Sequence, residues 1–175
     1  MIFRNLKSPS SDSFIDLISS IPDGCTEPLT IYLDQPYDTF DGFVFEYIDF
    51  FNSYKGEVTL VATGNLTNSS ALFFLCSNTK KVISPVSSLE LSKTDFAIFS
   101  TAAYDKESNK IKMTLTKYFH AFQKSIYSQL LNMEEMETYH SGEIVFIAPD
   151  RMKEVVVQAE KLFHIPKQTD NLPQI

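Results

Sequence analysis

Residues 57–77 constrain the fold more than any other part of the sequence, because a strand pattern there leads into a helix pattern with no polar face. The stretch EVTLVA at 57–62 is rich in β-forming residues and is typical of a strand. After Gly64, the segment 69–77 is almost wholly apolar and is predicted to be a helix. A helix that is apolar on all sides has to be buried on all sides. The protein must therefore pack other elements around this helix.

Strand and helix patterns alternate along the rest of the chain. Further helices are predicted at 12–21, 39–51, 111–131, 133–140 and 150–163, the last with Asp150 as its N-cap. Further strands are predicted at 28–34, 80–84, 88–92, 95–100 and 142–149. This alternation is typical of an α/β fold with a largely parallel sheet. At a length of 175 residues we expect one domain over 1–163 and a polar, flexible tail over 164–175.

Composition argues against several classes of function. The net charge of −7 opposes binding to nucleic acid or to a membrane surface. No apolar run approaches the roughly 20 residues of a membrane span. Cys25 and Cys76 belong to no cluster of cysteines and histidines, so we expect reduced thiols in a cytoplasmic protein and neither a metal nor a cofactor.

Two stretches carry a resemblance to a known family. IYLDQPYDTFDGFVFEYIDFF at 31–51 is similar to a strand, a Ser-Pro-Gly-Gly turn and a helix of the proteolytic subunit ClpP, and GNLTNSSALFFLCSNTKKVISP at 64–85 is similar to its Gly-x-x-x-Ser turn, buried helix and strand. The chain thus resembles the ClpP-like serine peptidases of the crotonase-like superfamily, which also holds signal peptide peptidase A. The resemblance implies a β-β-α superhelix, a protruding handle helix at 111–131, and assembly into rings.

The same resemblance assigns positions to a catalytic site. In register with signal peptide peptidase A, Ser69 occupies the nucleophile position, whereas the ClpP register makes Asn68 a competitor for it. Ser92 stands where the family has its catalytic histidine, and Glu143 where it has its acid. Tyr37 and Asp38 stand where the family has the two glycines of its oxyanion loop.

Chemistry at these positions is incomplete. Serine hydrolysis needs a base beside the nucleophile, and an alcohol such as Ser92 is not a base near neutral pH. Loss of the base alone costs about 10⁶ in turnover in a reference serine protease. Lys93 and His140 are candidates for a replacement base. The other reading of Asn68 and Ser69 is a helix cap, in which case Ser69→Ala should lower stability.

We therefore expect a catalytically inactive ClpP-like subunit with a role in assembly. The partners implied are further copies of the chain in a ring or a ClpP-type subunit, with any unfoldase on a separate chain. The candidate contact face is a stripe on the long helix, which could instead be core: Tyr118, Phe119, Phe122 and Ile126. The alternatives are an active serine peptidase that uses Ser69 with a non-standard base, and an acyl-CoA-handling enzyme of crotonase type.

Overall fold

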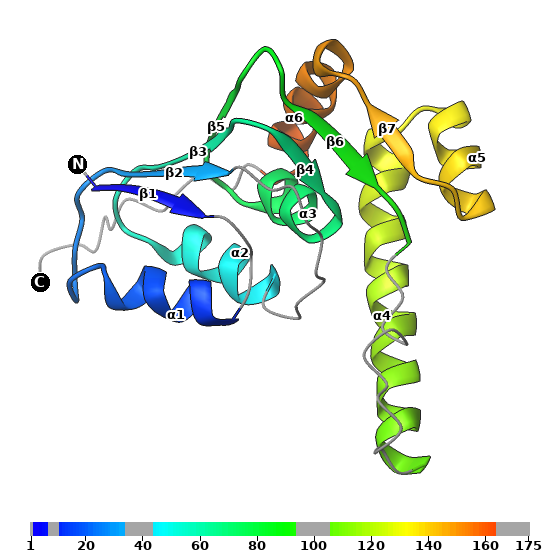
Figure 1. Cartoon of the computed structure of the whole chain (residues 1–175), viewed down its shortest axis with the longest axis horizontal. Helices are drawn as coiled ribbons and strands as arrows, with labels where there is room; N and C mark the ends of the chain where they lie inside the picture. Colours follow the sequence, from blue (N-terminus) through cyan, green and yellow to red (C-terminus); the bar gives the residue numbers. More distant parts are fainter. Residues whose placement is uncertain (1, 7–10, 34–43, 94–105, 164–175) are drawn as a thin grey trace, which may run out of the picture.

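The computed structural model describes residues 2–6, 11–33, 44–93 and 106–163 (Figure 1). Its strands are β1 (Ile2–Leu6), β2 (Leu29–Leu33), β3 (Val58–Ala62), β4 (Asn65–Thr67), β5 (Lys80–Ile83), β6 (Ser88–Leu91) and β7 (Val145–Ile147). Its helices are α1 (Ser11–Ser19), α2 (Val44–Ser53), α3 (Asn68–Cys76), α4 (Lys106–Leu130), α5 (Met133–Ser141) and α6 (Pro149–Phe163). Strands and helices alternate as the sequence predicts, and the α/β class is confirmed.

The larger sheet is parallel and has the strand order β1-β2-β3-β5. In β2 and β3 every second side chain is buried, which is the period of a strand with one covered face. Helices α1, α2 and α3 lie along that face (Figure 1). The covered face contributes these residues to the core: Leu29, Ile31, Leu33, Val58, Leu60 and Ala62.

A second sheet has the order β4-β6-β7, with β4 and β6 parallel and β7 antiparallel to β6. Only Thr63 and Gly64 separate β3 from β4, so the chain passes directly from the first sheet into the second. Strands β5 and β6 repeat this passage. Two strands from different sheets followed by a helix, as in β3-β4-α3, form the β-β-α unit that the resemblance implies.

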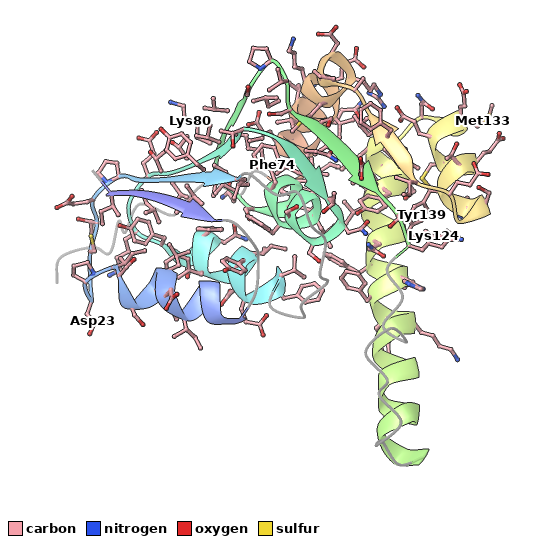
Figure 2. All side chains as sticks on the ribbon, in the orientation of Figure 1. Asp23, Phe74, Lys80, Lys124, Met133 and Tyr139 are labelled. Carbon is pink, nitrogen blue, oxygen red and sulfur yellow. The ribbon has the colours of Figure 1, made fainter. Side chains whose placement is uncertain are left out.

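Helix α3 fills the space between the two sheets. Every residue from Ser69 to Cys76 is buried, as the sequence predicts for a helix without a polar face. The helix packs against α2, β4, β6 and α6. Phe73 lies against the rings of Tyr47 and Phe51 of α2, at centroid distances of 5.5 and 6.0 Å. Phe74, labelled in Figure 2, is fully buried within the same core.

Helix α4 is the handle helix. With 25 residues it is about 37 Å long at 1.5 Å per residue. Figure 1 shows its N-terminal half extending away from the two sheets, while its C-terminal half lies against the body. The helix begins at Lys106, five residues before the predicted start.

The structure corrects several expectations about single elements. Strands β1 and β4 were not predicted, because β1 carries polar residues in its centre and β4 is only three residues long. Helix α6 begins at Pro149, so Asp150 is not its N-cap but lies in its first turn. The predicted strand at 95–100 and the tail at 164–175 lie outside the described residues.

An ion-pair network fixes the corner between α4, α5 and α6. Arg151 of α6 donates to both carboxylate oxygens of Glu135 at 2.9 and 3.0 Å, and to the Leu130 carbonyl at the end of α4 at 3.1 Å. Glu135 in turn accepts from the Asn132 N–H and caps α5. Burial acts to raise the pKa of Glu135, but the hydrogen bonds from Arg151 and Asn132 outweigh it and hold that pKa below its usual value. The charged form of Glu135 therefore stabilises this corner.

Replacement of Arg151 by Met should lower the free energy of unfolding by about 1–3 kcal/mol, because it leaves the Glu135 carboxylate partly buried without its cation. The pKa of Glu135 is lower in the folded protein than its ordinary value of 4.5. The ionised carboxylate therefore stabilises the fold above about pH 4.5, and this stabilisation is lost as the pH falls through the folded-state pKa. The gap between wild type and Arg151→Met should therefore narrow as pH falls below about 4.5. Urea unfolding at pH 7 and pH 4 measures it, with Lys153→Met as the exposed control on α6. A gap that stays constant with pH contradicts this account.

Candidate active site at the start of helix α3

The turn from β4 into α3 has an unusual backbone. Thr67 is extended, with φ −110° and ψ 146°, and Asn68 then takes a positive φ of 27°. Among non-glycine residues asparagine tolerates this region best, because its short amide side chain can bond locally. Outliers of this kind collect at functional sites, where the surrounding structure holds them. The sequence did not predict this conformation.

Ser70 satisfies one of the free backbone N–H groups at the start of α3. Its hydroxyl accepts from the Thr67 N–H at 3.0 Å and donates to the Thr67 carbonyl at 2.7 Å. The N-cap residue of the helix is Thr67, so the expected cap at Asn68 or Ser69 is wrong by one or two positions. A helix buried at this end needs such partners because its first N–H groups have none within the helix.

Ser69 faces the protein interior. Its side chain is 0% exposed, and in the part of the chain that the structure describes its hydroxyl has no hydrogen-bond partner. A nucleophilic serine needs both access for the substrate and a base within hydrogen-bond reach. The described residues give Ser69 neither.

Asn68 and Ser92 contact each other. The Asn68 Oδ1 atom accepts the backbone N–H of Ser92 at 2.8 Å and its hydroxyl at 3.0 Å. These are the two residues that the ClpP register puts at the positions of nucleophile and histidine. Their contact consists of neutral groups and contains no base.

Gln123 extends this contact to the handle helix. Its Nε2 atom lies 3.5 Å from the Ser92 carbonyl, a long hydrogen bond, and its side chain is fully buried. Asn68, Ser92 and Gln123 thus connect the start of α3, the end of β6 and the C-terminal half of α4. Sequence reasoning missed Gln123, although an amide between the apolar positions Phe122 and Ile126 could have drawn attention to it.

The remaining sequence-predicted catalytic residues lie apart from this contact. Glu143 is exposed after Gly142, and no hydrogen bond joins its carboxylate to Ser69, Asn68 or Ser92. Tyr37 and Asp38 lie outside the described residues.

Neither candidate replacement base is directed at Ser69. Lys93 donates to the His140 carbonyl at 2.7 Å, and its Nζ atom lies 5.7 Å from the centroid of the Tyr139 ring. His140 is exposed in the last turn of α5. Lys93 therefore joins the end of β6 to the C-terminus of α5, where a cation is favoured by the helix dipole.

The apolar stripe predicted as a contact face is mostly core. Phe119 and Ile126 are only 4% and 6% exposed, and Phe122 is half-buried. The ring of Phe45 lies edge-on to Phe119 and Phe122, at 5.9 and 5.3 Å. Of the four residues only Tyr118 is well exposed, at 72%. The chain itself covers most of this stripe, because α4 packs its C-terminal half onto the body.

Within the described residues, no group of three or more histidines, cysteines or acidic residues could hold a metal ion. None of the helices described is both long enough and apolar enough to cross a membrane.

Neighbouring serines Ser69 and Ser70 form a matched pair for a stability test. Ser69→Ala should leave the free energy of unfolding unchanged or raise it by up to about 1 kcal/mol, because it removes a buried hydroxyl without a partner. Ser70→Ala should lower it by about 1–2 kcal/mol, because two cap hydrogen bonds are lost. Denaturant unfolding of both variants measures the difference. A larger loss in Ser69→Ala than in Ser70→Ala contradicts the geometry.

Comparison with known proteins gives a likeness of structure alone. No family model matches the sequence, and no match to it is found among curated proteins. Among solved structures, a peptidase from Plasmodium falciparum is similar with a TM-score of 0.63 and 13% identity, over 89% of this chain and 92% of that one. A ClpP1 variant from Listeria monocytogenes is similar with a TM-score of 0.55 and 12% identity, over 89% and 85%. The chain has the fold of ClpP-like serine peptidases.

Proposed function

We propose that this protein is a catalytically inactive ClpP-like subunit that acts through assembly. The observation that carries the proposal is the bond between Asn68 Oδ1 and both donors of Ser92. If Asn68 occupies the nucleophile position and Ser92 the position of the histidine, an amide and an alcohol have replaced the reacting pair. Neither group ionises near neutral pH, and each is engaged by the other.

Burial of Ser69 supports the same proposal if the chain is aligned with signal peptide peptidase A, which puts Ser69 at the nucleophile position. If Ser69 is the nucleophile position instead, its hydroxyl is enclosed and has no described base beside it. Loss of the base alone raises the barrier by about 8 kcal/mol, which corresponds to the 10⁶ in turnover. In both registers, the described residues place no base beside the nucleophile position, which supports the loss of proton transfer.

In place of catalysis, these residues hold neighbouring elements of the fold together. Asn68, Ser92 and Gln123 tie the handle helix to the start of α3 and the end of β6. Lys93 ties the end of β6 to α5 through the His140 carbonyl. In this proposal the former catalytic positions fix how α4 and α5 are held relative to the two sheets. A subunit that works by assembly needs these elements in a fixed place.

The contact surface we propose differs from the stripe on α4. Among the strands that the structure describes, β7 lies at the edge of the second sheet, and its residues alternate between core and solvent. Ile144 and Phe146 are 61% and 60% exposed, and Met133 at the start of α5, labelled in Figure 2, is 78% exposed. Exposed apolar side chains at a sheet edge favour a partner chain. We take that partner to be a second copy or a ClpP-type subunit in the cytoplasm, with any unfoldase on a separate chain.

Activity-based labelling tests the loss of catalysis. Fluorophosphonate reacts with an activated serine, so wild type and Ser69→Ala should both stay unlabelled under conditions where an active ClpP-type peptidase is labelled. Intact-protein mass spectrometry reads the adduct directly. Labelling of wild type that disappears in Ser69→Ala would establish a working nucleophile and overturn the proposal.

Light scattering coupled to size exclusion tests assembly. We expect a particle of several times 19.9 kDa, alone or after mixing with a ClpP-type subunit. Phe146→Asp should shift it toward the 19.9 kDa species, because a carboxylate at the contact would be desolvated. Val86→Asp is the matched control, since Val86 is 73% exposed and lies in the turn between β5 and β6, outside both β7 and α5. A 19.9 kDa species in every condition rules out the role in assembly and leaves the labelling result unaffected.

A further inference from the structure

A hollow lies away from the candidate active site, between the C-terminal end of α3, strand β5 and the last turns of α6. Its volume of about 660 Å³ falls in the range of roughly 300–1,000 Å³ that is common for small-molecule sites. Lys80, which is labelled in Figure 2, is the first residue of β5 and one of the residues that line the hollow. The hollow is lined by Ser77, Thr79, Lys80, Lys81, Val157, Glu160, Lys161 and Phe163.

Positive charge is concentrated in this hollow. Three lining residues are lysines and one is a glutamate, in a chain whose net charge is −7. Lys80 has an ion pair with Glu57 at 3.9 Å, but both side chains are more than 60% exposed, so the pair is weak and leaves Lys80 able to contact a ligand. The hollow therefore attracts anions although the chain as a whole repels them.

Lys81 is the deepest of the three cations. Its Nζ atom donates to the carbonyls of Ser77 and Thr79, at 2.8 and 3.4 Å, at the C-terminal end of α3. Burial lowers the pKa of Lys81, and the nearby Glu160 opposes that shift. An anion beside the ammonium would favour its charged form further.

A polar atom without a partner also lies among the lining residues. The Thr79 hydroxyl is buried, and within the described part of the chain it has no hydrogen-bond partner. A buried hydroxyl normally has one. The hydroxyl is closed off from solvent, so the polar contacts available in the hollow come from the lysines.

Apolar groups form the rest of the wall. Val157, which is 49% exposed, and Phe163 are the apolar side chains among the lining residues, and the aliphatic stems of the lysines add to them. We propose that the hollow binds a small monoanion, a carboxylate that carries a short apolar chain. The lysines would hold the carboxylate, and the chain would cover Val157 and Phe163. A single negative charge fits better than phosphate, because Glu160 and Glu57 lie close by and the lining has no arginine to hold several oxygens.

Titration of the full chain with hexanoate, followed by amide resonances in two-dimensional NMR, tests the proposal. We expect saturable shifts at 77–81 and 157–163. Lys161→Gln should weaken binding about fivefold to tenfold, because one charge contact is lost. Lys81→Met should weaken it at least as much. Lys153→Gln, an exposed position on α6 outside the hollow, should bind like wild type.

Two further ligands separate charge from apolar contact. Hexan-1-ol should bind more weakly than hexanoate, and inorganic phosphate should produce no saturable shifts at these residues. Lys161 is exposed, so Lys161→Gln keeps the test decisive if Lys81→Met does not fold. The proposal is overturned if hexanoate does not saturate, if hexan-1-ol binds equally well, or if Lys161→Gln binds like wild type.

Discussion

Burial of helix α3 is the constraint on which the rest of the structure depends. A helix with no polar face cannot stand at a surface, so strands β4 and β6 of the second sheet and the helices α2 and α6 pack against it. The chain crosses from one sheet to the other on either side of this helix, at β3-β4 and at β5-β6. Removal of α3 would leave the covered faces of both sheets without a common layer.

The same burial explains the chemistry of the turn that precedes the helix. A helix start inside the protein needs partners for its N–H groups, and Ser70 supplies one by accepting from the Thr67 N–H. Ser69, one residue earlier, consequently faces the interior and is enclosed. In a related peptidase this turn would have to present a hydroxyl to substrate. Here the polar side chain at the turn that contacts a neighbouring strand is Asn68, which holds Ser92.

Prediction from sequence succeeded where the pattern was long and periodic. The buried helix, the strands β2 and β3, and the helices α2 and α6 follow from residue spacing, because each buries a single face or all faces. It failed for β1 and β4, which are held by pairing with β2 and β6 and not by their own composition. The stripe on α4 shows a second limit: spacing identified an apolar face, but not that Phe45 and the body of the same chain cover it.

The sequence by itself determined the α/β class, because the alternation of strand and helix patterns depends only on which residues stand in which order. Tertiary structure alone decided that Asn68, Ser92 and Gln123 meet. Asn68 and Ser92 are 24 residues apart in the sequence, and Ser92 and Gln123 are 31 residues apart. It also decided the positive φ of Asn68 and the direction of Lys93 toward α5. Side-chain direction and long-range contact are set by packing of the whole chain, and local spacing does not contain that information.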